Sequence, residues 1–130
     1  MDLTLNASER AFRDEVATWL AENAPRERRP PAGPAMVEFD VAWQRRQFDA
    51  GWAGISWPAE YGGRGLSLVQ QVIWYSEYAR AGAPTETGVC FVGNAHAGPT
   101  LIACADEELK RRHLPRILSG EEIWCQGFSE

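Results

Sequence analysis

Apolar side chains at helical spacing, bounded by capping residues, constrain this sequence most. In residues 7–23 they recur three and four positions apart, at Phe12, Val16, Trp19 and Leu20. Asn6 is placed to cap the first turn, and Glu9, three positions later, is placed to reach back to the backbone of Asn6. This pattern predicts a helix over residues 7–23, and the segments that follow extend the prediction to an all-α fold.

Two further segments are amphipathic. Residues 38–50 carry aromatic side chains among polar ones, and Gly51 suits the C-terminal cap of a helix there. Ser67 and Gln70 have the spacing of a capping box before an apolar run, and Gly82 closes that run. Both segments are predicted to be helices.

The remaining helical signals lie in the second half of the chain. Residues 86–104 are nearly uncharged, which predicts a central helix that is buried on most faces and is kinked or restarted at residues 98–99, a Gly-Pro pair. Asp106 can cap a short charged helix that ends at His113, and residues 115–120 are expected to form one more turn.

Proline and glycine mark two irregular segments. Residues 24–35 contain four prolines, which lack amide donors, so an exposed connector is expected. Residues 51–65 combine tryptophan and tyrosine with glycine turns, which is typical of an ordered, aromatic-rich loop. The glycines at 62, 63 and 65 lack the strand-to-helix setting and the GxGxxG order of a dinucleotide-binding loop.

The last segment changes character. Residues 123–129 alternate loosely and contain Trp124, Cys125 and Phe128, which suit an extended strand better than a helix. Because a lone strand has no partner with which to pair, the segment is interpreted as the start of a β domain in a chain cut at the domain boundary.

Composition excludes several function classes. The net charge of −5 argues against sequence-independent binding to nucleic acid, which needs a clustered basic surface. No apolar stretch approaches the roughly 20 residues of a membrane span. The three cysteines are odd in number and show no CxxC spacing, so neither a disulfide framework nor a metal site is predicted. With no signal peptide recognised, the expected location is the reducing cytoplasm.

Three segments resemble the acyl-CoA dehydrogenase family, and their order along the chain is that of the family. They are residues 57–67 (WPAEYGGRGLS), residues 114–120 (LPRILSG) and residues 124–130 (WCQGFSE). Residues 93–99 (GNAHAGP) and 106–110 (DEELK) are also similar to the central helix of the family and to the helix after it. The resemblance therefore spans almost the whole chain.

The resemblance implies a fold and a reaction. Family members have an N-terminal helical domain, a middle β domain and a C-terminal helical bundle, with FAD held between the last two and a neighbouring subunit. Residues 1–121 would form the N-terminal helical bundle, and residues 122–130 would be the truncated start of the β domain. The family oxidises acyl-CoA thioesters to 2,3-enoyl-CoA and passes the electrons to an electron-transfer flavoprotein, usually as a homotetramer or heterotetramer.

The terminal segment carries the predicted cofactor contacts. Alternation places positions 126 and 128 on one face of a strand, and a short hydroxyl can approach a ligand without crowding it. The resemblance implies that Gln126, Phe128 and Ser129 lie against the isoalloxazine ring of FAD, with Ser129 hydrogen-bonded to its reactive edge. An ordinary strand that packs Trp124 and Phe128 into a core would show the same pattern.

The predicted substrate contacts lie in the uncharged segment. Val89, Val92, Gly93 and His96 share one helical face. The resemblance implies that this face lines the acyl pocket, whereas the spacing alone favours an ordinary helix-packing surface. His96 has no carboxylate placed by sequence to orient it, so no catalytic role is assigned to it. The catalytic glutamate of the family usually lies farther downstream, and no catalytic residue is expected in this chain.

A rival interpretation uses the same residues differently. The uncharged helix and the exposed aromatic side chains would also suit a stand-alone helical module that binds a partner protein without catalysis. Under the enzyme hypothesis the 130-residue chain alone is expected to be inactive, and straight-chain, branched, aromatic and steroid-side-chain thioesters are all compatible with its residues.

Overall fold

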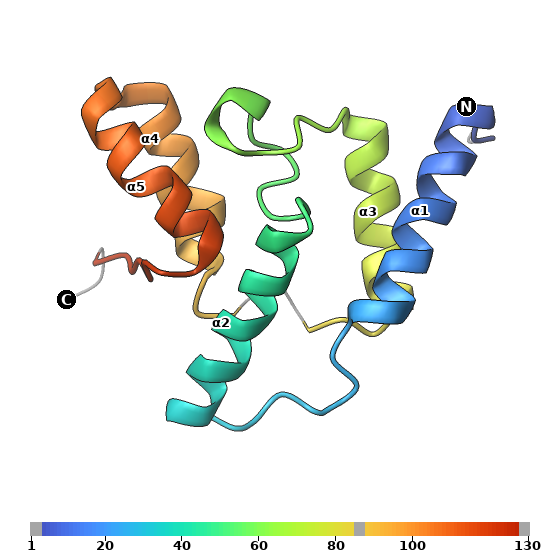
Figure 1. The fold of residues 1–130 in the computed structure, drawn as a ribbon, viewed down its shortest axis with the longest axis horizontal. Coiled ribbons are helices and arrows are strands. Elements are labelled where there is room, and N and C mark those ends of the chain that lie inside the picture. The colour runs from blue at the N-terminus through green and yellow to red at the C-terminus, as the bar shows by residue number, and fades with distance from the viewer. Residues whose placement is uncertain (1–3, 85–87, 128–130) are drawn as a thin grey trace.

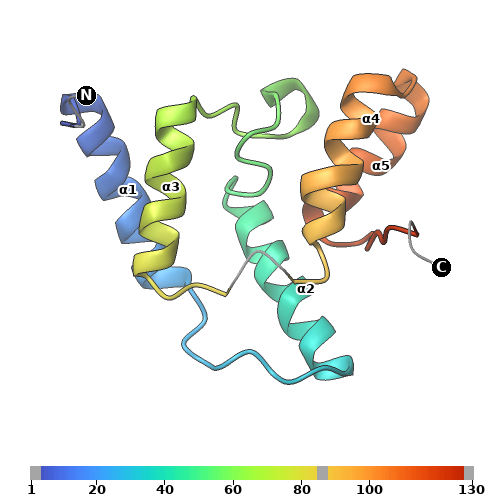
Figure 2. The ribbon, with the colours of Figure 1, turned by 180° about the vertical axis from the view of Figure 1, so that it is seen from behind.

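A computed structural model describes residues 4–84 and 88–127, and within them it confirms the all-α class (Figure 1). The five α-helices are α1 (Ala7–Asn23), α2 (Pro34–Asp49), α3 (Leu68–Arg80), α4 (Gly98–Cys104) and α5 (Glu107–Ser119). A 3₁₀ turn covers Ala59–Tyr61, and a π-helix covers Gly93–Ala97 directly before α4. Both views show α1 beside α3 at one end, α4 beside α5 at the other, and α2 between the two pairs (Figure 2).

Two of the predicted helix starts are capping boxes in the structure. The Asn6 side chain accepts from the amide of Glu9 at 2.9 Å, and the Glu9 carboxylate accepts from the amide of Asn6 at 2.8 Å. Ser67 and Gln70 make the same reciprocal pair at 3.3 and 3.0 Å. Each box provides acceptors for two backbone amides that have no partner within the helix. The residues of a box are three positions apart, so the sequence predicted both helix starts.

One hydrophobic cluster, here called the aromatic core, joins α1, α2 and α3. Its buried members are Phe12, Val16, Leu20, Trp43, Trp52, Ile55, Leu66, Ile73, Trp74 and Tyr78. Trp52 and Trp74 stack with ring centroids 4.7 Å apart, and the Trp43 indole donates to the Tyr78 hydroxyl at 2.6 Å. Stacking removes a large apolar surface from water, and the hydrogen bond provides a partner for the Trp43 N–H within the core.

A second cluster, here called the α5 core, lies under the other pair of helices. Its buried members are Ala53, Trp57, Leu114, Ile117 and Leu118. Gln44 of α2 reaches this side and donates to the Leu118 carbonyl at 2.7 Å, while Phe48 packs against the cluster. Because α2 also supplies Trp43 to the aromatic core, this helix is the shared wall of the two clusters.

Three predicted helix descriptions need correction. Helix α2 begins at Pro34, four residues before the predicted start, since proline is favoured in the first turn, where its missing amide costs nothing. Helix α5 runs unbroken through Pro115 because the buried apolar residues around this proline hold the backbone helical. Residues 98–104 are not buried on most faces, since Pro99 and Thr100 are exposed and only Gly98 is buried there.

The predicted terminal strand is not formed within the described residues. Residues 123–127 have no regular secondary structure, and positions 128 and 129 lie outside the described part of the chain. A strand is defined by ladder hydrogen bonds to a neighbour, and no second strand is present among the described residues to make them.

Candidate functional site

Two sets of predicted site residues from distant parts of the sequence meet in the structure. The Gln126 amide N–H donates to His96 Nδ1 across 2.5 Å, and the Phe91 ring meets the His96 ring edge-on with centroids 5.2 Å apart. His96 and Gln126 are both exposed. The predicted acyl-lining segment and the predicted flavin-contacting segment therefore share one open surface.

A π-helix forms the base of this surface. The Gly98 amide bonds to the Gly93 carbonyl, five residues back, in place of the four-residue step of an α-helix. The wider turn contains both Gly93 and His96. Single-turn π segments inside helices are rare and occur frequently at functional sites, so the departure from α geometry marks this segment as more than a connection.

The four residues predicted to share one helical face have different surroundings. Gly93 is buried, and a Cβ there would lie 3.0 Å from Ile117 and 3.9 Å from Trp124. His96 is exposed, while Val89 and Val92 are half-buried. Of the predicted cofactor contacts, Gln126 is described, whereas Phe128 and Ser129 lie outside the described residues. The predicted face is therefore closely packed at Gly93 and exposed at His96.

A cleft of about 290 Å³ lies beside the same segment. It is bounded by α2, α3 and the loop that follows α2, and the segment contributes Cys90, Phe91, Asn94, Ala95 and Pro99. None of the four predicted acyl-lining residues lines it. Sequence reasoning missed Phe91, which borders both the cleft and the His96 surface, because side chains five residues apart do not share a face of an α-helix.

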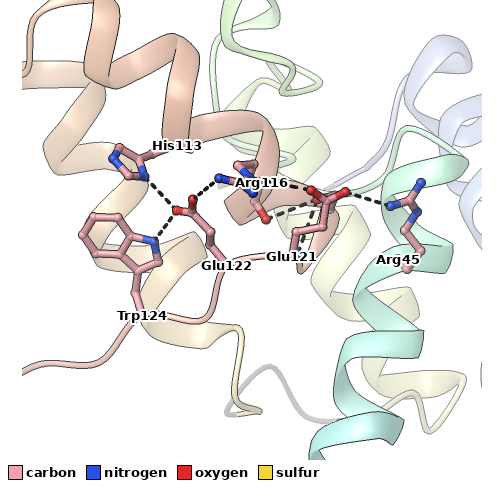
Figure 3. A network of polar contacts seen from close by, with 7 residues as sticks. Arg45, His113, Arg116, Glu121, Glu122 and Trp124 are labelled. Atoms are coloured by element: carbon pink, nitrogen blue, oxygen red, sulfur yellow. Dashed lines mark hydrogen bonds and ion pairs between the residues drawn. The ribbon is translucent and has the colours of Figure 1, made fainter.

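A network of charged groups fixes the path of the chain after α5 (Figure 3). The Glu122 carboxylate accepts from His113 Nδ1 at 2.8 Å, from Arg116 at 3.2 Å and from the Trp124 indole at 3.3 Å. Burial would raise the pKa of Glu122, but the hydrogen bond and charge of His113, with help from Trp124 and Arg116, hold this pKa below its usual value. The network places Trp124 edge-on against His113, with ring centroids 5.5 Å apart.

A second anchor holds the start of the segment to α2. Arg29 donates to both oxygens of Asp40 at 2.6 and 2.5 Å, and the Val89 amide donates to Asp40 at 3.0 Å. The hydrogen bonds from Arg29 lower the pKa of Asp40, burial opposes them, and the Val89 amide adds to the lowering. Burial, with the nearby charge of Asp40, raises the pKa of Cys90 to about 11, so this thiol is not an activated nucleophile.

Acid is expected to weaken the fold through Asp40. Because its pKa is lowered in the folded chain, its contribution to stability is complete above the unfolded pKa of about 3.9 and is lost as pH falls through the lower folded value. Asp40→Asn should therefore be less stable than the unmodified chain near neutral pH, and the difference should shrink below about pH 4. Urea unfolding curves across this range measure the difference.

The exposed Asp49 provides a matched control, since it forms an ion pair with Arg45 one helical turn away and is 60% exposed. The free energy of unfolding of Asp49→Asn should equal that of the unmodified chain at every pH. Parallel stability curves for Asp40→Asn and the unmodified chain would contradict the assignment of acid sensitivity to Asp40.

The described residues contain no other obvious chemical centre. Within residues 4–84 and 88–127, no group of three His, Cys, Asp or Glu side chains is placed to hold a metal ion. No helix in these ranges has both the length and the apolar composition of a bilayer span. The chemical features of the described surface are the His96–Gln126 pair and the segments that hold it.

Comparison with known proteins decides the family. Residues 6–121 match the family described as acyl-CoA dehydrogenase, N-terminal domain. The chain belongs to the acyl-CoA dehydrogenase family. The protein named acyl-CoA dehydrogenase IpdE1 of Mycobacterium tuberculosis is 44% identical over 126 residues, which cover 92% of this chain and 32% of that protein. Acyl-CoA dehydrogenase FadE26 of the same organism is 33% identical over 135 residues, which cover 100% of this chain and 33% of that protein.

Solved acyl-CoA dehydrogenase structures share the fold. The crystal structure of the ChsE4-ChsE5 complex from Mycobacterium tuberculosis has a TM-score of 0.72 and 32% identity, and the match covers 93% of this chain and 30% of that chain. A structure titled Tcur3481-Tcur3483 steroid ACAD has the same TM-score and identity, with 95% and 32% covered. The chain thus spans about a third of the length of the acyl-CoA dehydrogenases that it matches.

Proposed function

We propose that this chain is the N-terminal part of an FAD-dependent acyl-CoA dehydrogenase that oxidises acyl-CoA thioesters to 2,3-enoyl-CoA. The meeting of His96 with Gln126 carries the proposal, because the first lies in the segment similar to the family's acyl-lining helix and the second in the segment similar to its flavin-contacting strand. In the proposed arrangement residues 1–121 are the helical domain and residues 122–130 lead into the middle β domain.

The exposed residues at positions 126 and 127 are compatible with a flat cofactor. Gln126 and Gly127 are exposed, and a Cβ at Gly127 would meet nothing within 4 Å, so a ring can approach this edge without displacing protein atoms. Gln126, with Phe128 and Ser129, would hold the isoalloxazine ring. When bound, FAD supplies the acceptor for the hydride removed from the acyl chain.

The role proposed for this chain is to bind and to exclude water. Val89, Val92, Gly93 and His96 would wall the acyl pocket, with the Phe91 ring beside them. An apolar wall next to the reacting carbons removes water that would compete for the reactive intermediate. Proton abstraction is assigned to a glutamate downstream of this chain, so no residue described here takes a catalytic role.

The proposed assembly and substrate follow from the family. The full protein would be a cytoplasmic homotetramer or heterotetramer that passes electrons to an electron-transfer flavoprotein. Both solved neighbours bear the names of two chains, ChsE4-ChsE5 and Tcur3481-Tcur3483, which supports an assembly of unlike subunits as the first to look for. Since one of these titles names a steroid enzyme, a steroid-side-chain thioester is the first substrate to assay.

The proposal is tested with the product of the natural gene. An intact mass about three times the 14.5 kDa of this chain is expected, because relatives are about three times as long. That product, purified with FAD, should reduce a dye acceptor in the presence of an acyl-CoA, whereas the 130-residue chain should show no turnover. Turnover by the short chain would contradict its proposed role as an incomplete part.

The assay also separates the rival function. A gene product that neither binds FAD nor oxidises any thioester, alone or with a second chain encoded beside it, would sink the enzyme proposal. The helical interaction module would then be the better account of the exposed apolar residues Leu68, Val72 and Tyr75 on α3.

A further inference from the structure

The π-helix leaves one backbone carbonyl without an amide donor. In an α-helix the Asn94 carbonyl would accept from the amide of Gly98, but that amide is bonded to Gly93. In a continued π-helix the donor would be residue 99, which is a proline and has no N–H. Neither the α-helical nor the π-helical amide donor is therefore available to the Asn94 carbonyl, and a hydrogen bond to it contributes about 0.5–1.5 kcal/mol.

Trp57 supplies the missing hydrogen bond. Its indole N–H donates to the Asn94 carbonyl at 3.0 Å, and the side chain is 2% exposed. The ring lies so close to Gly98 that a Cβ at that position would be 1.9 Å from a ring carbon. Trp57 therefore contacts the Asn94 carbonyl within the π-helix and also Gly98, where the π-helix meets α4.

The loop that carries Trp57 is itself held from both sides. The Trp57 amide donates to the Gly54 carbonyl and the Trp57 carbonyl accepts from the Gly65 amide, each at 2.9 Å. Gly63 packs against the Trp57 backbone so closely that a Cβ there would lie 2.2 Å from the Trp57 carbonyl oxygen. These contacts hold the backbone of Trp57 in place, from which the indole reaches the π-helix.

The side chain of Asn94 has its own partner and does not compete for the indole. It exchanges hydrogen bonds with Gln44 at 2.9 and 3.3 Å, and Gln44 also donates to the Leu118 carbonyl. The Asn94 side chain thus secures the segment to Gln44 of α2, while the Trp57 indole donates to the backbone carbonyl of the same residue.

We propose that Trp57 is a positioning residue for the acyl-binding surface, acting through its indole N–H on the π-helix that holds Gly93 and His96. The effect of Trp57 on substrate binding rests on the proposed function, whereas its effect on the backbone of the π-helix does not. A π-helix inserts one residue into the helical register, and removing it would turn Gly93 against α4 by about 100°. His96 would then leave Gln126, and the open surface would change shape.

The test removes the indole N–H donor and then supplies a backbone N–H donor in its place. Trp57→Phe keeps a large ring over Gly98 but removes the N–H. Pro99→Ala restores an amide at the one position from which a π-helix can serve the Asn94 carbonyl. Trp57→Phe should raise KM for the acyl-CoA in the full-length enzyme about tenfold with a smaller change in kcat, and adding Pro99→Ala should recover most of that loss.

Two further measurements on the 130-residue chain keep the positioning claim separate from the enzyme claim. In the unmodified chain the Trp57 indole proton should exchange with deuterium far more slowly than that of free tryptophan. In Trp57→Phe the nuclear Overhauser contacts between His96 and Gln126 should weaken, and in the double variant they should return.

The possible outcomes distinguish the positioning role of Trp57 from the proposed function of the full protein. Fast exchange of the Trp57 indole, unchanged His96 contacts in Trp57→Phe, or failure of Pro99→Ala to restore them would overturn the proposal, since loss of ring packing alone cannot be repaired by an amide at residue 99. Absence of dehydrogenase activity in the unmodified full-length protein would instead remove the proposed function and leave the exchange and contact measurements to decide the role of Trp57.

Discussion

Trp74→Ala is expected to lower the free energy of unfolding by about 3–5 kcal/mol. Trp74 is 1% exposed and stacks on Trp52, with Trp19 and Tyr78 also within ring-contact distance. Removing the indole takes away its buried apolar area and leaves a cavity that three surrounding rigid rings cannot collapse to fill. Urea unfolding followed by far-ultraviolet circular dichroism measures the change.

Leu68→Ala is the control on the same helix. Leu68 is 79% exposed, so its truncation should change stability by no more than about 0.5 kcal/mol. Both variants place alanine in α3, so differences in helix propensity stay small. Equal effects at the two positions would mean that the aromatic core is not the main source of stability for this helix.

Gly98→Ala has the second largest expected effect, and its sign is diagnostic. Gly98 has ordinary helical backbone angles, so alanine would by propensity alone stabilise α4 by about 0.5–1 kcal/mol. The added Cβ, however, would lie 1.9 Å from the buried Trp57 ring, so either the ring or the helix must move. We expect a net loss of about 1–3 kcal/mol, as for an overpacked core, together with weaker contact between His96 and Gln126.

Gly127→Ala provides the matched glycine control. A Cβ at Gly127 meets nothing within 4 Å, so this variant should unfold at the same urea concentration as the unmodified chain. If Gly98→Ala behaved like Gly127→Ala, or stabilised the chain, the close approach of Trp57 to the start of α4 would be wrong.

Local signals in the sequence predicted most of the helices. The capping boxes at Asn6 and Ser67 depend on residues three positions apart, so the information needed to place them lies within one turn. The continuation of α5 through Pro115 was not predictable in this way. It depends on Leu114, Ile117 and Leu118 packing against Ala53 and Trp57 in the loop after α2, far away in the sequence, and that packing outweighs the lost hydrogen bond.

The candidate site was predictable only in part, for the same reason. Helical spacing placed Gly93 and His96 on one face, and the family resemblance attached a ligand role to that face and to Gln126. Neither kind of reasoning could foresee the π-helix, because it requires an indole from residue 57 to pair a carbonyl at residue 94. The Gly98-Pro99 pair was predicted to kink or restart the helix, and α4 does begin at Gly98. That Pro99 also lacks an amide that would compete with this indole was not predicted.

The uneven placement of the indoles has an optical consequence. Four of the six tryptophans lie in or against the aromatic core, and the stacked pair Trp52–Trp74 is close enough for its electronic transitions to couple. Intrinsic fluorescence and near-ultraviolet dichroism will therefore follow mainly the end of the molecule that contains α1 and α3. Opening of the π-helix and α4 would mainly change the surroundings of Trp57 and Trp124, so it would contribute only a minor part of such a signal.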